Sequence, residues 1–482
     1  MTGPSAVGTF FIEWSQKGPP ATCTSAVHLS WAHPEQRDRG AKPVSSWLEW
    51  SIVHGPLPWA ISFLGLAGLG YLILRRGKTW WLWRVLPVWL GVALVVGGTF
   101  VYIDYIAHLW ADKTPRRAIF FIALGVFGLG LWVLNLIRTD LYRRIIASVA
   151  VIALVAGCAT QFNIVFGTYQ TVRTALGLPQ PGEGSFDQVK KGANTVTVPP
   201  GKYLDDVWQA PAGLPPVGTL TTVQIPGAVS KFPARSARLW VPPAYYAHPQ
   251  PKLPVLVLLA GQPGEPEQWI TGGLITERMN DYAAVHDGLA PIVVMPDDLG
   301  PGGMDGSANP LCVDGPRGNA DTYLSVDVPN WIKHNLQADT DTTHWAIGGL
   351  SHGGMCAMQM AVYHPKLYPT FVNMSGTNEP TLGYTDLTVR DFFGGDRAAF
   401  SAINPVEILR ARKFPELLGV WVVGAQDNLF RWQMEHTLSV AKEAGVQTYR
   451  YLPPGEHNWS VWGPGLMLAM QQLAPRMGLI RP

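Results

Sequence analysis

Four long apolar runs lie before residue 167, and they restrict the fold of this chain more than any other feature. They are Leu57–Leu74, Val85–Ile103, Ala118–Ile137 and Ile145–Phe166. Each is long enough to cross a bilayer as a helix, and none contains a charged residue. Arginine and tryptophan clusters flank them, as is common where helices leave the membrane. A buried helical core does not suit four such runs in series, so we expect four transmembrane helices.

Basic residues in the short loops predict the orientation of these helices. If the C-terminal part lies outside the cytoplasm, seven Lys and Arg residues are cytoplasmic and three are external. Cytoplasmic loops usually carry the excess of Lys and Arg, so we expect a multi-pass protein of the cell membrane with an extracytoplasmic C-terminal part. The seven are Arg75, Arg76, Lys78, Arg84, Arg138, Arg143 and Arg144, and the three are Lys113, Arg116 and Arg117.

Composition shifts divide the chain into four parts. Residues 1–50 have no helix or strand period, so we expect a disordered tail, or a true start further along, for example at Val44. Residues 51–166 hold the apolar runs, residues 167–215 form a linker rich in Pro and Gly, and residues 216–482 form a folded domain. A net charge of +2, with 15% charged residues, does not favour a nucleic-acid partner.

Solid apolar runs alternate with helical patterns in residues 216–482. Such runs are typical of parallel strands that are buried on both faces, so we expect an α/β fold with a mostly parallel sheet covered by helices. The expected strands are Leu220–Ile225, Ala237–Val241, Pro254–Leu259, Pro291–Met295, Trp345–Ile347, Thr370–Met374 and Val420–Val423. The expected helices include Val328–Leu336, Met355–His364, Pro405–Arg412 and Trp432–Ala444.

The pentapeptide Gly349-Leu350-Ser351-His352-Gly353 predicts a nucleophilic serine. It stands between a buried strand-like run, residues 344–348, and the small-residue start of a helix, residues 354–361. Strand, sharp turn and helix around G-x-S-x-G are typical of a nucleophile elbow, in which the glycines permit the turn. We therefore expect Ser351 to attack acyl groups. The alternative is an ordinary Gly-rich turn.

A serine nucleophile needs a base that takes its proton and an acid that orients the base. In folds with this elbow the acid follows the serine in the chain and the histidine comes last. Asp427 follows the strand-like run 420–423, and His457 lies on a predicted loop near the C-terminus. We expect these two residues to complete a triad, with Glu435 as the second choice for the acid. A helix N-cap and a surface histidine are the alternatives.

The oxyanion formed in acyl transfer needs two backbone N–H donors. The residue after the nucleophile, His352, supplies one. The turn after the strand 254–259 is expected to supply the other, from Gln262 or, as second choice, Gly261, because Pro263 has no N–H. Cys312 and Cys356 are expected to form a disulfide in an oxidising compartment, the alternative being two buried thiols. No metal-ligand spacing or cofactor motif is found, so we expect neither group.

Several separated motifs resemble one family. Leu258-Leu259-Ala260-Gly261-Gln262, the pentapeptide around Ser351, and Gly455-Glu456-His457-Asn458-Trp459-Ser460-Val461-Trp462 resemble the esterase D / antigen 85 group of α/β-hydrolases, the "putative esterase" family, in its membrane-anchored actinobacterial form. The resemblance implies a Ser351–His457–Asp427 triad with His352 and Gln262 as oxyanion amides. Ala260 departs from the usual His or Asp, and antigen 85 proteins usually have Glu as the acid, so mycolyl transfer is not carried over.

The expected function is therefore that of a membrane-anchored serine esterase. Its ester substrate would be an acylated or aminoacylated lipid or another component of the cell envelope. One alternative is an acyltransferase that passes the acyl group to a sugar or glycolipid, and another is a catalytically idle domain that serves as a scaffold or binding module. The sequence identifies no protein partner, acyl chain or alcohol.

Overall fold

The computed structural model describes residues 46–74, 78–107, 113–137, 139–192, 195–302 and 309–482. The expected tail, residues 1–50, and the suggested start at Val44 therefore lie almost wholly outside the described residues. The described end of that tail forms a 3-10 turn, Ser46–Glu49. Glu49 pairs with Arg173 at 2.6 Å, and the carbonyl oxygen of Trp50 accepts from the N–H of Val172 at 3.1 Å. This end is thus attached to the segment that follows the last membrane helix.

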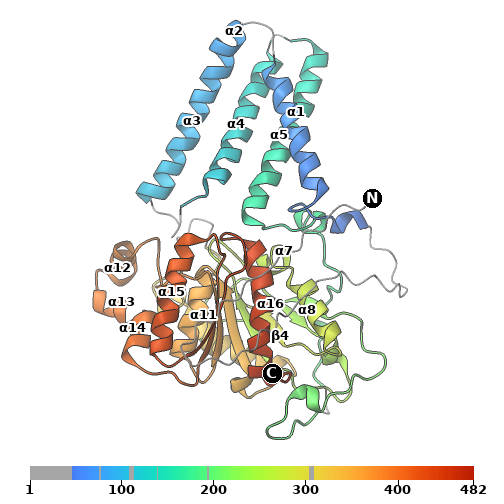
Figure 1. The fold of residues 1–482 in the computed structure, drawn as a ribbon, viewed down its shortest axis with the longest axis vertical. Coiled ribbons are helices and arrows are strands. Elements are labelled where there is room, and N and C mark those ends of the chain that lie inside the picture. The colour runs from blue at the N-terminus through green and yellow to red at the C-terminus, as the bar shows by residue number, and fades with distance from the viewer. Residues whose placement is uncertain (1–45, 75–77, 108–112, 138, 193–194, 303–308) are drawn as a thin grey trace, which may run out of the picture.

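Four helical segments form a bundle above the α/β domain (Figure 1). All four are long and apolar enough to cross a membrane, which confirms the four predicted spans. Large side chains such as Trp59 and Leu94 are exposed on the bundle, as suits contact with lipid tails. The segments are α1 (Pro56–Ile73), the continuous run of α2 (Lys78–Trp80), η2 (Trp81–Val85), α3 (Leu86–Val101) and η3 (Tyr102–Ala107), then α4 (Arg116–Leu136) and α5 (Leu141–Phe166).

Glycines let α1 and α5 approach each other closely. A Cβ at Gly68 would lie 2.4 Å from the carbonyl oxygen of Ala150, and a Cβ at Gly65 would lie 3.1 Å from that of Ala153. Small residues at helix interfaces are the usual means of packing helices in lipid. The buried Asn135 of α4 adds a polar contact, because its amide donates to the carbonyl oxygen of Leu72 at the end of α1 (3.1 Å).

An eight-stranded sheet forms the centre of the α/β domain, in the order β1-β2-β4-β3-β7-β8-β9-β10. Strands β1 and β2 are antiparallel to their neighbours, and the other six are parallel to one another. The mostly parallel sheet and the α/β-hydrolase fold predicted from the sequence are confirmed. The strands are β1 (Thr219–Val223), β2 (Ala237–Val241), β3 (Val255–Leu259), β4 (Ile292–Met295), β7 (Trp345–Leu350), β8 (Thr370–Met374), β9 (Leu418–Val422) and β10 (Gln447–Tyr451).

Helices cover the sheet, so that β3, β7, β8 and β9 are buried along their whole length. Helix α11 packs against β3, β7 and β8, and α16 packs against β8 and β9. The helices are α7 (Gln268–Thr271), α8 (Ile275–Val285), α9 (Ala320–Thr322), α10 (Val328–Asn335), α11 (His352–Tyr363), α12 (Thr385–Phe393), α13 (Arg397–Ile403), α14 (Pro405–Ala411), α15 (Asn428–Glu443) and α16 (Trp459–Arg476), and a small hairpin, β5 (Asp314–Gly315) with β6 (Gly318–Asn319), precedes α9.

The linker lies along the surface of the α/β domain and has no core of its own. Its side chains Val189 and Leu204 are buried in the core of that domain. The N–H of Leu204 donates to the carbonyl oxygen of Gly478 (2.9 Å), and Glu183 pairs with Arg238 of β2 (2.6 Å). Many contacts therefore hold the segment between the bundle and the sheet.

The carboxyl edge of the sheet faces the membrane bundle (Figure 1). Asn458, which precedes α16, donates its side-chain amide to the carbonyl oxygen of Val165 in the last turn of α5 (3.2 Å). The N–H of Gln170, just after α5, donates to the carbonyl oxygen of Thr271 at the end of α7 (3.2 Å). Functional groups of open α/β sheets gather at this edge, so the membrane helices adjoin the place where a site is expected.

Candidate active site

Ser351 occupies a strained turn between β7 and α11. Its φ of 51° and ψ of −121° lie in a region that few residues other than glycine adopt. The flanking glycines permit this turn: a Cβ at Gly349 would lie 2.2 Å from the carbonyl oxygen of Gly353, and a Cβ at Gly353 would lie 2.3 Å from that of Ala260. The N–H of Ser351 donates to the carbonyl oxygen of Met374 at the end of β8 (2.8 Å). This geometry matches a nucleophile elbow.

Three of the predicted residues meet at this turn. The Oγ of Ser351 lies 3.1 Å from the Nε2 of His457, and the Nδ1 of His457 lies 2.9 Å from the Oδ2 of Asp427. The Asp427 side chain is 5% exposed and that of His457 is 21% exposed. Asp427 also accepts a hydrogen bond from the N–H of Phe430 (3.3 Å), so it caps α15 as well as contacting the histidine. The runner-up acid, Glu435, pairs instead with Arg431 on the surface of α15 (3.1 Å).

Two aromatic side chains hold the His457 ring. Phe430 stacks on it, with 3.8 Å between ring centroids, and Trp462 approaches edge-on at 4.8 Å. The indole N–H of Trp462 donates to the Oγ of Ser375 (3.2 Å), which fixes the indole in turn. The imidazole is thus oriented by a carboxylate on its edge and by rings on two sides. The sequence analysis did not single out Phe430. Its place three residues after Asp427, in the first turn of the helix that Asp427 caps, could have indicated that its ring lies near the triad.

The predicted oxyanion donors lie beside the serine. His352 is the first residue of α11, and N–H groups in the first turn of a helix have no partner within it. The turn after β3 approaches from the other side, because a Cβ at Gly261 would lie 3.3 Å from the Cβ of Ser351. Gln262 follows in this turn, and its side-chain carbonyl accepts from the amide of Asn309. Asn309 therefore braces the turn that carries the predicted donor.

A buried polar cluster lies behind His352. Its ring is 7% exposed, and its Nδ1 lies 3.3 Å from the amide nitrogen of Asn309. The Nε2 lies 3.6 Å from the Oδ2 of Asp298. Burial lowers the pKa of His352 to about 4, and burial together with the neighbouring Asp297 raises the pKa of Asp298 to about 8. At neutral pH the contact therefore joins two uncharged groups and is not an ion pair.

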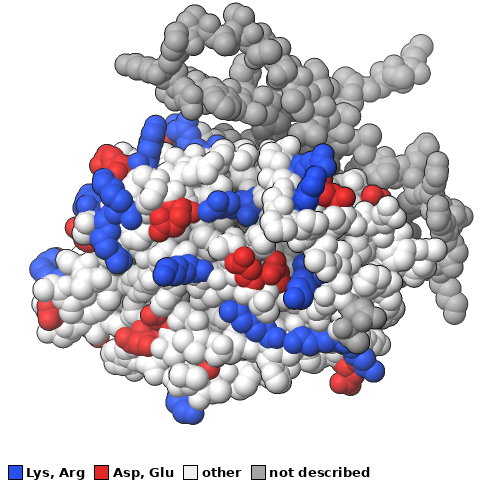
Figure 2. Space-filling view, turned by 90° about the horizontal axis from the view of Figure 1, so that it is seen from below, with Lys and Arg blue, Asp and Glu red and all other residues white. Residues whose placement is uncertain are grey.

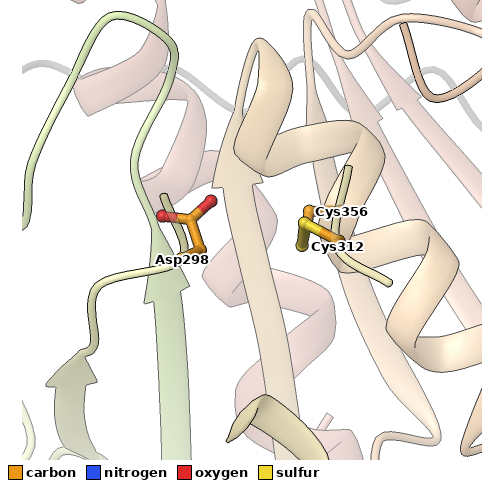
Figure 3. A group of neighbouring side chains, drawn as sticks. All are labelled: Asp298, Cys312 and Cys356. Carbon is orange, nitrogen blue, oxygen red and sulfur yellow. A yellow bond between two sulfur atoms is a disulfide. The ribbon is translucent and has the colours of Figure 1, made fainter. Parts of the chain in front are cut away.

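Cys312 and Cys356 form a disulfide between the loop that follows Asn309 and helix α11 (Figure 3). With Asp298 they make the one group of metal-ligand residue types found among the described residues, their ligand atoms lying within 4.8 Å of one another. Metal ligation by cysteine needs thiolate sulfurs, and a disulfide has none. The bridge instead ties the loop that braces Gln262 to the helix that begins at His352.

The geometry is that of acyl-transfer enzymes, and comparison with known proteins agrees. A family model described as "Putative esterase" matches residues 234–473. An uncharacterized protein of Corynebacterium glutamicum is 34% identical over 407 residues, which cover 82% of this chain and 90% of that protein. The chain belongs to this esterase family. It is a serine ester hydrolase, and the matched residues lie within the folded unit 216–482, which we call the esterase domain. The alignment with the Corynebacterium protein is longer than this domain, so the relative also shares part of the preceding segment.

Several solved structures of similar fold match just over half of the chain. A ferulic acid esterase is 18% identical with a TM-score of 0.46, and the match covers 54% of this chain and 99% of that chain. An S-formylglutathione hydrolase from Agrobacterium tumefaciens is 17% identical with a TM-score of 0.45, and the match covers 54% of this chain and 96% of that chain. MPT51 of Mycobacterium tuberculosis is 17% identical with a TM-score of 0.39, and the match covers 54% of this chain and 98% of that chain.

Proposed function

We propose that the chain is a multi-pass membrane protein whose extracytoplasmic domain hydrolyses carboxylic esters of acylated or aminoacylated envelope lipids. Ser351 is the nucleophile, His457 the general base and Asp427 the group that orients His457. The observation that carries the proposal is the unbroken chain of contacts from Ser351 through His457 to Asp427, at 3.1 and 2.9 Å. It lies at the edge of the sheet to which the membrane helices are attached.

The reaction follows from these positions. The Oγ of Ser351 attacks the ester carbonyl carbon while its proton passes to the Nε2 of His457, and the N–H groups of His352 and Gln262 stabilise the oxyanion. When the C–O bond breaks, His457 returns the proton to the leaving alkoxide and the acyl group stays on Ser351. Water then attacks the acyl-enzyme with His457 as base, which releases the acid and restores the serine. Asp427 keeps the Nδ1 proton in place throughout.

Two observations support an extracytoplasmic site. Lys78, Arg84, Arg143 and Arg144 belong to helix segments at the end of the bundle away from the esterase domain, where the positive-inside rule places the cytoplasm. The Cys312–Cys356 disulfide lies in the esterase domain, and disulfides persist chiefly in oxidising compartments. A cysteine introduced at the exposed Val285, in a Cys23→Ala/Cys158→Ala background that leaves no other free thiol, should react with a membrane-impermeant maleimide in intact cells. Reaction only after permeabilisation would place the domain inside.

A fluorophosphonate probe tests the catalytic proposal in the full-length protein. We expect one adduct, on Ser351, and no labelling in Ser351→Ala or His457→Ala. Glu435→Gln is the matched control, because Glu435 is a carboxylate on the helix that Asp427 caps but lies in a surface pair. Folded protein that reacts with no probe would contradict the proposal, and so would an adduct on another serine. Product analysis with long-chain lipid esters then separates release to water from transfer to an alcohol.

A further inference from the structure

Large apolar side chains are exposed at one edge of the esterase domain. Within its described residues, the exposed apolar side chains larger than valine are Tyr384, Leu429 and Trp432, at 44%, 51% and 63%. Tyr384 lies in the segment that follows β8, while Leu429 and Trp432 lie in the first turns of α15, which follows β9. Both segments therefore start at the carboxyl edge of the sheet, and we call these three residues the apolar rim.

Two side-chain contacts connect the apolar rim to the membrane helices. Phe430, next to Leu429, stacks on the His457 ring at 3.8 Å. The next residue along the chain from His457, Asn458, is bonded to the carbonyl oxygen of Val165 in the last turn of α5. The start of α15 is thus two side-chain contacts away from a transmembrane helix, and Figure 1 shows this end of α15 turned toward the bundle.

The length of α5 gives the depth of this edge. The apolar run of this helix, Ile145–Phe166, ends one residue after Val165. As a helix this run rises by about 33 Å, which is close to the roughly 30 Å of the hydrocarbon core. The contact between Asn458 and Val165 therefore lies near the boundary between the acyl chains and the headgroups, and the carboxyl edge of the sheet begins there.

The opposite face of the esterase domain differs in character. Figure 2 views the domain from the side away from the bundle, and Lys, Arg, Asp and Glu of both signs are scattered over that face. A mixed charged surface is typical of contact with water. Trp and Tyr prefer the membrane–water interface, and leucine gains by burial in the acyl boundary. The composition of the apolar rim therefore favours contact with lipid, and the composition of the far face favours contact with water.

We propose that the apolar rim inserts into the outer boundary of the bilayer that holds the bundle, so that esters of membrane lipids reach Ser351 without leaving the membrane. This rests on the proposed function for its substrate, while the insertion itself is a separate physical claim. A single helix would be enough to keep the domain near the membrane. A bundle of four helices that contacts the domain also fixes its depth, and insertion of the rim requires this. The occupant of the rim is the lipid bilayer.

Spin labels measure the insertion directly. Leu429→Cys, Trp432→Cys and the control Val285→Cys are made in the full-length Cys23→Ala/Cys158→Ala protein, with the disulfide retained, and placed in vesicles of phosphatidylcholine and phosphatidylglycerol. Val285 is 77% exposed and ends α8, which leads away from the carboxyl edge. We expect labels 429 and 432 to collide with dissolved oxygen more than with an aqueous nickel chelate, and label 285 to do the reverse. Aqueous behaviour at 429 and 432 would overturn the proposal. Shielding from both reagents would indicate a second copy or a protein partner and overturn it too.

Activity gives the second readout. Leu429→Asp and Trp432→Asp should lower the ratio of hydrolysis of a long-chain ester in vesicles to hydrolysis of a short soluble ester by about tenfold. Val285→Asp should leave this ratio as in the wild type. If Ser351 reacts with the fluorophosphonate but the ratio is unchanged, the insertion proposal fails and the proposed function stands. If the labels insert but Ser351 does not react, the proposed function fails and the membrane contact stands.

Discussion

The side-chain amide of Asn458 donates to the carbonyl oxygen of Val165 across 3.2 Å, and this joins the catalytic loop to a transmembrane helix. The last carbonyl groups of a helix have no partner within it, so Asn458 satisfies one of those of α5. The Oδ1 atom of the same side chain accepts a hydrogen bond from the N–H of Ser460 (3.1 Å) and so caps α16. One side chain thus fixes two helix ends, directly after His457.

Replacing Asn458 separates its two contacts. Serine is a good N-cap but cannot reach Val165, whereas alanine loses both contacts and should cost about 1 kcal/mol for the lost cap. We expect Asn458→Ser to keep the melting temperature of the wild type but to slow fluorophosphonate labelling of Ser351 by about tenfold, because His457 is less well placed. Labelling rates and melting curves in the same detergent check this. Wild-type labelling in Asn458→Ser would show that the link to α5 does not position the histidine.

Asp427→Asn tests the acid of the triad without removing the cap of α15. Asparagine caps helices as well as aspartate does, so the fold should persist. The amide no longer holds the Nδ1 proton of His457 in the required tautomer, and we expect kcat for a soluble ester to fall by about 10³–10⁴. Glu435→Gln should stay within about twofold of the wild type, since exposed pairs contribute little. Equal losses in the two variants would contradict the assignment of Asp427.

Most of the sheet was predictable because its strands are buried on both faces. The run Thr370–Met374 and the run Ala237–Val241 match β8 and β2 residue for residue. Helix α16 was not predicted, because Pro464 and Pro475 lie inside it and argue against a helix. Helix α15 begins four residues before the predicted Trp432, since its start is set by the Asp427 cap and not by an apolar period.

The triad residues were predictable from chain order and the elbow motif. The cluster behind them was not, because it joins segments that no local pattern connects. Its members lie far apart in the sequence and meet only in the folded domain: Asp298 follows β4, Asn309 lies in the loop before β5, and His352 begins α11. Sequence shows Asp298 after a buried strand, but its neutral state follows from complete burial, which the sequence does not reveal.

Removing the disulfide should destabilise the esterase domain. The bridge closes a loop of 44 residues, which corresponds to about 4 kcal/mol of unfolded-state entropy in the chain-entropy model. We expect Cys312→Ser/Cys356→Ser to melt at a lower temperature. Fluorophosphonate labelling should slow as well, since the loop carrying Asn309 is no longer tied to α11. Reducing agent should give the same change in wild type and none in the double variant. Equal melting temperatures would show that packing alone holds this loop.

Asp298→Asn should stabilise the protein increasingly as the pH rises. An unfolded aspartate loses its proton near pH 4, whereas burial raises the pKa of Asp298 to about 8 in the fold. Between these values the folded state binds the extra proton, so wild-type stability falls as the pH increases from 5 to 8. Asparagine has no such proton. The melting temperature of the variant minus that of the wild type should therefore grow across this range. The growth should be about 3 °C for each kcal/mol of unfolding free energy that the wild type loses. A difference that is constant with pH would show that Asp298 ionises in the fold as it does in water.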